Sequence, residues 1–440
     1  MQLLELSEAH TLFESGSNSL LRSMEITRRI ARALPRKKPG KGIIMNNNMK
    51  KESFFSSLAP NDRYMIGNLF FLYLIQGIYT ILIGSILPMI KAEYDLSYQI
   101  GGYLISAHST GNIVAGLFAG LIPLLIGIKS SLMILNLLPI IGFFLVLITG
   151  NPFILIFAFL LTGLGRGSIS NYNNQAVSTL SGGNSSPLNA LHGFFAIGAV
   201  TAPLIALTCT RLGQKGWRIA VVIILALLLL SVFNSAFMKM DSVTYSRSEK
   251  KENAFGFLRE RPFLYSIGIM FLYLCVEATV MGWMVTYYEE CGVLASGTAQ
   301  LLNSLLWITI LVGRFGCSAI GGRFDPAVII RVLSAGILAF LCIVLFTNNL
   351  PLMLAGTIGL GLSLSGMYGT TVANAGDVFG RYPLAMGIFV TLSGVGSIIT
   401  PSVIGTVAES AGIRTGMRIL LAPALVLLAV AVLNRGSRRN

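Results

Sequence analysis

Twelve apolar runs, each of about 20 residues or more, constrain this chain more than any other feature of its sequence. A helix needs about 20 residues to cross the hydrocarbon core of a bilayer, which is about 30 Å thick. Only 11% of the residues are charged and 54% are hydrophobic, whereas soluble domains average about 25% charged residues. The sequence therefore predicts an all-α integral membrane protein with about twelve transmembrane helices. The runs lie at roughly 66–90, 97–125, 130–149, 152–178, 187–209, 217–238, 262–288, 297–321, 327–347, 351–376, 383–407 and 414–434.

The formal net charge of the chain is +14, and much of the excess precedes the first apolar run. Lys and Arg beside the first span hold that end of a membrane protein in the cytoplasm. We favour this topological interpretation over nucleic-acid binding, which a basic cluster also permits. Residues 1–62 are expected to form a basic, disordered cytoplasmic tail. They lack the layout of a signal peptide. The basic residues are Arg22, Arg28, Arg29, Arg32, Arg36, Lys37, Lys38, Lys41, Lys50 and Lys51.

A charged segment at 239–261 divides the spans into two sets of six. The expected units are bundles at 63–238 and 262–434, followed by a short basic tail at 435–440. Six spans in each bundle place both termini on one side, which the basic residues assign to the cytoplasm of a plasma-membrane protein. The acidic Glu93, Asp95, Glu289 and Glu290 then fall on the outer side, as expected. Arg211, Lys215 and Arg218 fall there too, and the sequence offers no reason for them.

Short motifs recur in the two halves at nearly equal offsets of 200, 196 and 198 residues. Three such offsets, which link spans 1 to 7, 4 to 10 and 5 to 11, indicate an internal repeat. Two pseudo-symmetric six-helix bundles related by a parallel repeat define the major facilitator fold, in which the substrate lies near the midplane between the halves. The pairs are FLYL at Phe71–Leu74 and Phe271–Leu274, Gly-Leu-Gly at Gly163–Gly165 and Gly359–Gly361, and Gly198-Ala-x-x-Ala-Pro203 with Gly396-Ser-x-x-Thr-Pro401.

The segment Leu188–Ala199, with Pro203 after it, resembles the fifth-span signature of the fucose–galactose–glucose sugar permeases in the major facilitator superfamily. The stretch around Glu277, with Trp283 and Tyr287, is similar to the seventh span of that family. Gly313-Arg314 and the region from Gly361 to Pro401 also look similar, and the resemblance covers roughly residues 64–434. It implies a transporter of a small solute, a sugar, by alternating access.

The chain departs from that family at two positions. Fucose–proton symporters of the family carry an acid in span 1 four residues before a Pro, where this chain has Gly84 before Pro88. They carry another acid in span 4 after the Gly-Leu-Gly motif, where Ser168 stands here. Proton coupling by that route is therefore in doubt, although a proton or sodium ion can couple elsewhere.

Glu277 lies near the middle of the run Phe271–Tyr287, where a charge costs about 2.5–3.5 kcal/mol on insertion scales. Such a residue normally faces a wet cavity or a partner, so Glu277 is the first candidate for ion coupling. The alternative is a Glu bonded to a neighbouring helix.

Arg166 is a second intramembrane charge, and it shares a helical face with Ser170, Asn173 and Asn174. We hypothesise that Arg166 and Glu277 pair in one state and separate when substrate or a proton binds.

Two other interpretations of Arg166 remain open. It can cap a packed polar cluster, or it can bind a carboxylate or phosphate of the substrate. Substrate contacts are further predicted for Gln76 and Tyr79, because amides and hydroxyls at midplane depth suit sugar hydroxyls. Trp283 and Trp307 either stack on a sugar ring or anchor the helix at the membrane interface.

His192 either joins the ion coupling or serves as a satisfied hydrogen-bonding partner. The Cys spacing predicts no metal site, and no cofactor is expected. No motif of an enzyme is present, nor a P-loop for ATP hydrolysis. The sequence thus predicts a secondary transporter in the lipid bilayer, a functional monomer that binds a small molecule and no nucleic acid. The rival functions are an efflux carrier for drugs or organic anions and a non-transporting membrane sensor.

Overall fold

The computed structural model describes residues 58–118, 122–181, 185–213, 215–238, 255–290, 296–320, 323–376, 378–382 and 384–434. The chain divides into two units, Met1–Ser57 and Leu58–Asn440, and all described residues belong to the second. The expectations for the basic tail before residue 58, for most of the charged segment (239–254) and for the end at 435–440 therefore lie outside the described residues.

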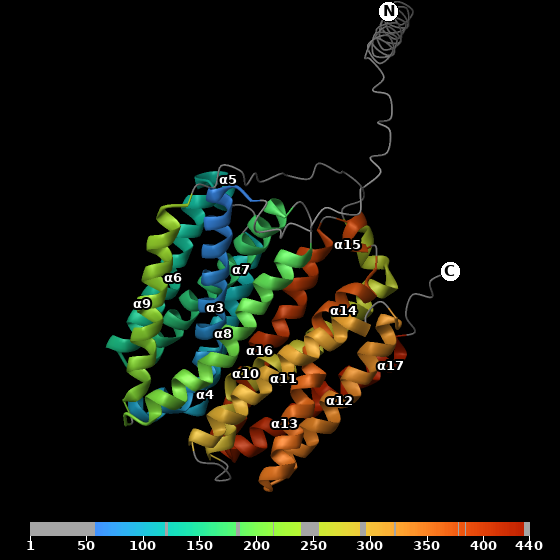
Figure 1. The fold of residues 1–440 in the computed structure, drawn as a ribbon. Coiled ribbons are helices and arrows are strands. Elements are labelled where there is room, and N and C mark those ends of the chain that lie inside the picture. Colours follow the sequence, from blue (N-terminus) through green and yellow to red (C-terminus); the bar gives the residue numbers. More distant parts are fainter. Residues whose placement is uncertain are drawn as a thin grey trace, which may run out of the picture. The chain divides into compact units, whose positions relative to one another are not determined.

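All regular elements of the described residues are helical, and they follow the predicted spans closely (Figure 1). The first half contains α3 (Pro60–Tyr94), α4 (Tyr98–Phe118), α5 (Ile122–Ile126), α6 (Ile128–Ile148), α7 (Pro152–Leu180), α8 (Ser185–Thr210) and α9 (Gly216–Ala236). The second half contains η1 (Gly256–Arg259), α10 (Arg261–Glu290), α11 (Ser296–Ile320), α12 (Pro326–Phe346), α13 (Leu350–Ser365), α14 (Met367–Asn374), α15 (Val378–Arg381), α16 (Ala385–Arg418) and α17 (Leu421–Leu433).

Ten described helical segments are long and apolar enough to cross a membrane. Two further features bring the number of crossings to twelve. Helix α4 is 21 residues long but is more polar, with its polar residues packed inside the protein. Helix α16 breaks at Gly412, whose φ of 79° lies in the left-handed region that favours glycine. The break divides one long apolar segment into the eleventh and twelfth spans, so the prediction of about twelve transmembrane helices is confirmed.

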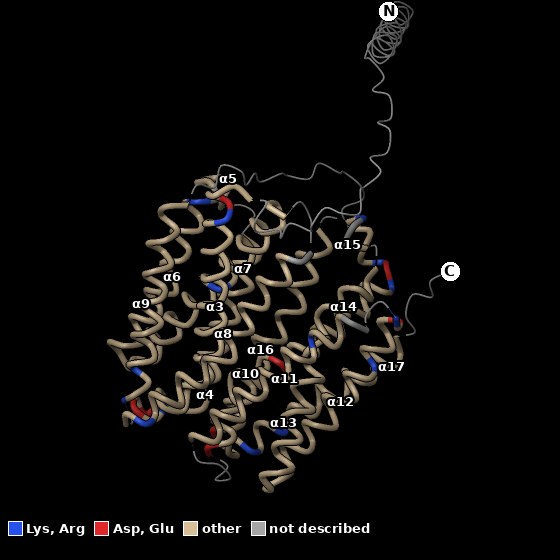
Figure 2. Tube along the Cα trace, viewed as in Figure 1, with Lys and Arg blue, Asp and Glu red and all other residues tan. Residues whose placement is uncertain are grey.

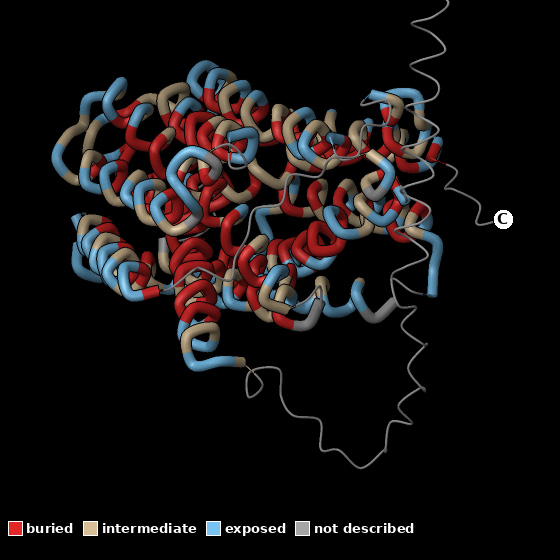
Figure 3. Tube along the Cα trace, turned by 90° about the horizontal axis from the view of Figure 1, so that it is seen from above, coloured by how far each residue is buried: buried red, intermediate tan, exposed pale blue. Residues whose placement is uncertain are grey.

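Large apolar side chains cover the outer faces of the peripheral helices. On α6 the exposed residues Ile134, Leu137, Ile141, Phe144 and Ile148 recur every three or four positions. This spacing puts them on one face of the helix, and such a face suits lipid rather than water. Buried residues instead line the helix faces that point inward, as Figure 3 shows from above. Charged residues lie mostly near the helix ends, with few along the middle (Figure 2).

The helices form two bundles that correspond to the two halves of the sequence. In the first, α3 packs on α8, and α7 packs on α4 and α6; in the second, α10 packs on α16, and α13 packs on α11 and α12. The bundles meet where α4 contacts α16, α8 contacts α11 and α3 contacts α10. The fold is the predicted all-helical one of paired six-helix bundles.

The same local cap begins α7 and α13 and reveals the repeat in atomic detail. The side chain of Asn151 accepts hydrogen bonds from the first turn of α7, and its own N–H donates to Thr149 Oγ1 at 3.1 Å. The side chain of Asn349 caps α13, and its N–H likewise donates to Thr347 Oγ1 at 3.1 Å. Asn is a preferred N-cap because its side-chain oxygen satisfies free backbone N–H groups. The two caps are 198 residues apart, which matches one of the sequence offsets.

Glycines allow the closest helix contacts, as at the crossing of α7 and α4. A Cβ on Gly163 would lie 1.9 Å from the carbonyl oxygen of His108, and one on Gly167 would lie 2.4 Å from that of Asn112. No side chain fits at either position, since both obstacles are backbone atoms. The two glycines therefore fix how closely α7 approaches α4, and α7 carries Arg166 between them.

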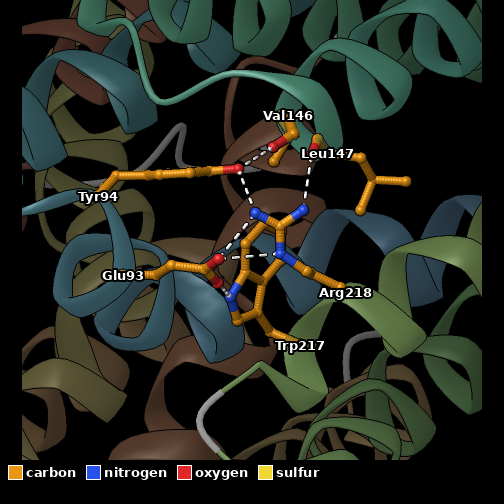
Figure 4. A network of polar contacts seen from close by, with 6 residues as sticks. All are labelled: Glu93, Tyr94, Val146, Leu147, Trp217 and Arg218. Atoms are coloured by element: carbon orange, nitrogen blue, oxygen red, sulfur yellow. Dashed lines mark hydrogen bonds and ion pairs between the residues drawn. The ribbon is translucent and has the colours of Figure 1, made fainter.

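Arg218, which had no explanation at the sequence level, closes one end of the first bundle (Figure 4). Its guanidinium donates to Glu93 Oε1 at 2.7 Å and to the Leu147 carbonyl at 2.7 Å, so it joins the start of α9 to the ends of α3 and α6. The Trp217 indole donates to the other oxygen of Glu93 at 2.6 Å. The Tyr94 hydroxyl lies 3.0 Å from Arg218 and donates to the Val146 carbonyl. Arg218 is thus a structural residue within its bundle.

Candidate functional site

Glu277 lies on α10 and is held by a tyrosine one helical turn before it. The Tyr273 phenol donates to Glu277 Oε1 at 2.5 Å and lies 3.0 Å from the carbonyl oxygen of Leu364 on α13. A hydrogen bond to an ionised carboxylate is about twice as strong as one between neutral groups. The carboxylate is partly exposed, whereas Tyr273 is buried. Tyr273 therefore fixes the orientation of Glu277 without enclosing it.

Arg166 lies on α7, in the other bundle. Its guanidinium makes no hydrogen bond or ion pair with any residue that the structure describes. The electrostatic neighbours of the guanidinium are Tyr73 and Tyr79 on α3 and Glu277 on α10. Arg166 therefore faces the interior between the bundles rather than lipid. In this structure Arg166 and Glu277 interact at a distance and form no direct ion pair, so their hypothesised pairing in another state stays a prediction.

Gln76 links α3 to α7 beside Arg166. Its Nε2 donates to Ser170 Oγ at 2.6 Å and to the Arg166 carbonyl at 3.2 Å. The Gln76 side-chain oxygen is buried and has no partner. One turn further along α7, Asn174 Nδ2 lies 3.4 Å from the Tyr73 hydroxyl, and the Asn174 oxygen is also without a partner. Two side-chain acceptor oxygens, one on α3 and one on α7, are thus unused.

Asn173 and Tyr79 turn toward the inside of the first bundle. Asn173 Nδ2 donates to the Leu69 carbonyl on α3 at 3.0 Å, which ties the two helices together. The Tyr79 ring is fully buried and packs edge-on against Phe143 of α6, with 5.8 Å between ring centroids. The Tyr79 hydroxyl has no partner. In this structure Asn173 is a packing contact, while Tyr79 remains an electrostatic neighbour of Arg166.

A second arginine, Arg314 of α11, belongs to the same region. Its electrostatic neighbours are Glu277 and Tyr273 in its own bundle and Tyr73 and His192 in the other. Like Arg166, it makes no hydrogen bond or ion pair with a described residue. The position of α11 against α8 brings it there, and no sequence motif indicates this contact.

The remaining predicted residues surround this cluster or lie away from it. The ring of the exposed His192 on α8 meets the Tyr73 ring edge-on at 5.4 Å. Trp307 on α11 is buried, and its indole N–H has no partner. His108, by contrast, is satisfied inside the first bundle, where its Nδ1 lies 2.9 Å from Thr162 Oγ1. No group of three or more potential metal ligands occurs among the described residues.

Trp283 lies at the end of the bundles where α3 and α10 finish, which we call the closed end. Its indole donates to the Pro401 carbonyl at 3.2 Å, and its ring packs against Gly101 of the other bundle. Lys91 bridges the bundles there by an ion pair of 3.3 Å with Glu290. Trp283 thus packs between the bundles in this state, in contact with neither lipid headgroups nor the Arg166 cluster.

Tyr98 completes the closed end. Its phenol donates a hydrogen bond to Glu290, and its backbone N–H donates to Glu409 of α16 at 2.7 Å. Lys91 Nζ lies 3.3 Å from the centre of the Tyr98 ring, a cation–π contact. Further along the interface, Gln300 donates to the Ser85 carbonyl at 2.8 Å, and Ser106 donates to the Ile398 carbonyl at 2.5 Å. All these bonds join the two bundles in the portion of their interface that is nearer to the closed end.

The fold and the site together indicate the class of protein to which the chain belongs. Two helical bundles enclose charged residues at mid-helix, contributed by both halves, and are latched at one end. This is the arrangement of a membrane transporter that exposes a central site to alternate sides.

The chain belongs to the Major Facilitator Superfamily, whose family model matches residues 69–348. It is 30% identical over 115 residues to the human Major facilitator superfamily domain-containing protein 4A, covering 26% of this chain and 22% of that protein. It is 28% identical over 147 residues to the zebrafish protein 4B, covering 33% and 27%. The matched segments thus span about a quarter of the length of these relatives. Members of the superfamily are transporters rather than enzymes.

Solved structures agree in fold. The nucleoside transporter NupG matches with a TM-score of 0.69 at 13% identity, over 86% of this chain and 99% of that one. A D-xylose–proton symporter matches with a TM-score of 0.69 at 12% identity, over 84% and 97%. FucP in the outward conformation matches with a TM-score of 0.59 at 19% identity, over 86% and 100%. At these identities the likeness concerns the fold alone.

Proposed function

We propose that the chain is a secondary active transporter that moves a small polyhydroxylated solute, a sugar or similar molecule, by alternating access. The observation that carries this proposal is the placement of Arg166 and Glu277. They lie at mid-helix on different bundles, within electrostatic reach of each other and without a direct bond. Charges within a membrane-spanning segment are costly, so their presence at this position favours a role in binding and coupling.

Each group has an assigned role in this proposal. Glu277, oriented by Tyr273, takes up the coupling proton or sodium ion, and His192 on α8 is a second candidate for this coupling. Arg166, Ser170, Asn174 and Gln76 contact the solute from the first bundle. Trp307 contributes from the second. Trp283, Asn173 and Tyr79 join the site only if the bundles move, since all three serve as packing contacts in this state.

The contacts of Lys91, Tyr98 and Glu290 at the closed end, which we call the latch, indicate how the conformation would change during transport. The bundles are joined at the closed end by Lys91, Tyr98 and Glu290, so this state opens at the opposite end. We place the closed end outside the cell, in the plasma membrane, with both termini in the cytoplasm and a monomer as the working unit. The bundles at 63–238 and 262–434 then rock against each other as rigid bodies. The partial likeness to the fucose–galactose–glucose permeases and to solved sugar and nucleoside transporters supports a polyhydroxylated solute.

The test is uptake into proteoliposomes that contain the purified protein. A panel of labelled sugars is offered with and without a proton gradient and a sodium gradient. We expect one gradient to drive accumulation of a panel member. Glu277→Gln should abolish accumulation but preserve exchange of labelled for unlabelled solute, since exchange needs no net ion movement. Glu260→Gln, which alters an ion pair with the exposed Arg381, is the matched control.

Two results would contradict the proposal. If no polyhydroxylated solute enters although the reconstituted protein remains folded, transport of this class is wrong. If Glu277→Gln accumulates solute as well as the parent protein, the coupling role of Glu277 is wrong.

A further inference from the structure

We propose that Gln300 and Asn303 of α11, with Trp307 one turn further along the helix, form a second set of solute contacts. They make a hydroxyl-binding site on the closed-end side of Glu277, which becomes available when the bundles separate at that end. This inference rests on the proposed function and makes it more specific, because it names residues that distinguish the hydroxyl groups of the solute.

The three residues lie on one face of α11, and that face meets the first bundle. They follow one another at spacings of three and four residues, which places them in a row along the helix. Gln300 Nε2 donates to the Ser85 carbonyl of α3 at 2.8 Å, and Asn303 Nδ2 donates to Ser85 Oγ at 3.3 Å. Both amides therefore reach from the second bundle to a single residue of the first.

The neighbouring Ser304 confirms the direction of this face, and the opposite face of α11 is apolar. Ser304 Oγ donates to the Val200 carbonyl of α8, also in the first bundle, at 3.3 Å. The polar row thus points into the protein rather than to lipid. The large hydrophobic residues of α11 that are exposed are Leu301, Ile308, Val312 and Phe315.

Each of the three side chains has hydrogen-bonding capacity that this state leaves unused. Gln300 Oε1, Asn303 Oδ1 and Trp307 Nε1 have no partner, although the residues are at most 2% exposed. Buried polar atoms are nearly always paired, so an unpaired set in one row requires an explanation. A hydroxyl group both donates and accepts, so it matches an amide that offers an oxygen beside an N–H. The row has the chemistry of a site for a polyhydroxylated molecule.

The row lies next to the central cluster, one helical turn nearer to the closed end. Gly84, which precedes Ser85, packs so tightly on α10 that a Cβ there would overlap the Met281 carbonyl oxygen. Met281 is four residues after Glu277, in the direction in which α10 approaches the closed end. Helix α11, as the next span, runs the opposite way, so its row leads from the closed end toward the depth of Glu277.

The bonds to Ser85 join the two bundles, so they must break when the closed end opens. Asn68 provides the contrast: its amide donates to Ser235 Oγ at 3.0 Å within the first bundle, and its oxygen is also unpaired. Movement of one bundle against the other leaves Asn68 covered, whereas it uncovers the amides of Gln300 and Asn303. Each of these then offers a free donor and a free acceptor.

Ser85 occupies the place that the solute would take. In this state its carbonyl and hydroxyl oxygens accept from the two amides, as two neighbouring hydroxyls of a sugar would. A solute that enters from the closed end would bind Gln300 and Asn303 first and then move on toward Glu277. Ser85 would take its place and close the path behind it.

The experiment uses D-glucose and analogues that each lack one hydroxyl, namely 2-, 3-, 4- and 6-deoxyglucose. Each analogue competes with labelled D-glucose for exchange by the full-length protein in proteoliposomes. In the parent protein, removal of a hydroxyl that an amide binds should weaken competition by about three- to tenfold, the effect of one neutral hydrogen bond.

Variants assign the lost hydroxyls to the side chains of the row. Asn303→Ala and Gln300→Ala should each weaken D-glucose by about three- to tenfold. Each should also lose discrimination against one deoxy analogue, because the hydroxyl that the analogue lacks no longer has a partner. Trp307→Phe, which keeps an aromatic ring and removes the indole N–H, should do the same. Asn68→Ala is the matched control and should leave discrimination unchanged, and Tm in detergent checks that each variant is folded.

Ser85→Ala separates solute binding from the bond between the bundles. It removes the acceptor of Asn303 and leaves both amides in place. Discrimination among the deoxy analogues should therefore persist, and D-glucose should compete as well as in the parent protein or better. An equal loss of discrimination in Ser85→Ala and Asn303→Ala would show that the amides act only by joining the bundles, and would overturn the site.

The other outcomes separate this inference from the proposed function. If Gln300→Ala and Asn303→Ala exchange D-glucose with the discrimination of the parent protein, the hydroxyl-binding site is wrong and sugar transport stands. If Asn68→Ala loses discrimination as they do, the effect is one of general destabilisation, and the site is again wrong. Failure of the parent protein to exchange D-glucose would count against both proposals.

Discussion

The Tyr273 hydroxyl donates to Glu277 Oε1 at 2.5 Å, one helical turn away on the same helix. The same phenol lies 3.0 Å from the Leu364 carbonyl, so one side chain connects the carboxylate of α10 to α13. The orientation of the Glu277 carboxylate therefore depends on how α10 packs against α13 in its own bundle, as well as on the space between the bundles.

Replacing Tyr273 by Phe tests this connection. The substitution keeps the ring and removes the donor, so Glu277 and the Leu364 carbonyl both lose a partner. We expect a loss of about 1–3 kcal/mol in stability, seen as a lower Tm in detergent, and weaker ion-driven uptake. Tyr265→Phe, earlier on α10, is the control. Equal uptake and Tm in the two variants would contradict the role of the phenol.

A double-mutant cycle tests the relation between Arg166 and Glu277. Arg166→Gln and Glu277→Gln each leave one charge without its counterpart, and because both residues are partly exposed and not in direct contact, we expect each to cost less than the about 3–5 kcal/mol of a fully desolvated pair. The double variant removes both charges, so we expect it to lose less than the sum of the two single losses. Tm and substrate exchange are the measurements. Strict additivity would show that the two charges act independently.

The exposed pair of Arg381 and Glu260 is the control for that cycle. Its side chains are 52% and 31% exposed, and its nitrogen–oxygen distance is 3.2 Å. Ion pairs of this kind contribute about 0–1 kcal/mol because solvent screens them. We expect a coupling energy near zero in the same assays.

Lys91→Met should weaken the latch at the closed end. It removes the ion pair with Glu290 and the cation–π contact with Tyr98, both of which join the bundles. We expect a larger share of molecules with that end open. Spin labels on Ala92→Cys and Ser410→Cys, at exposed positions of the two bundles, would give longer distances by electron spin resonance in a cysteine-free background.

Two further variants make the latch experiment decisive. The charge exchange Lys91→Glu with Glu290→Lys should restore part of the short distance. Glu93→Gln should leave the distance unchanged, because Glu93 bonds within its own bundle. If Lys91→Met leaves the distances as they are, the ion pair does not hold the closed end.

Gly163→Ala should disrupt the crossing of α7 and α4. The new Cβ would lie 1.9 Å from the His108 carbonyl oxygen, so the helices must separate, at a cost of about 1–3 kcal/mol or more. Gly67→Ala on α3 meets nothing within 4 Å and should stabilise the helix by about 0.5–1 kcal/mol. Tm shifts of opposite sign are expected. A similar shift in both would contradict the close approach at Gly163.

The spans and the two-bundle architecture could be predicted because lipid imposes long apolar runs, and their ends follow from Asn and Asp caps with nearby Pro. The repeated Thr149-x-Asn151 and Thr347-x-Asn349 caps were also visible in the sequence but were not recognised. Tyr273 could have been found as well, since a spacing of four residues places it on the face of Glu277.

The remainder of the site depends on how the bundles meet. The position of Arg314 against Tyr73 and the pair Lys91–Glu290, 199 residues apart, follow from helix–helix packing and not from any local pattern. For the same reason the sequence could not show that Trp283 lies between the bundles, or that Arg218 pairs with Glu93. Composition predicts which helices cross the membrane, whereas contacts between helices decide what each polar residue does.

The acids that end α3 and α10 illustrate what a duplicated architecture permits. Glu93 and Glu290 stand 197 residues apart, close to the repeat offset, yet Glu93 bonds to Arg218 in its own bundle and Glu290 reaches Lys91 in the other. In the proposed alternating-access cycle the Glu93–Arg218 pair stays intact, whereas the Glu290–Lys91 pair breaks and re-forms in every turnover. Two halves with the same architecture thus use equivalent acids differently: Glu93 joins helices within the first bundle, and Glu290 joins the two bundles to each other.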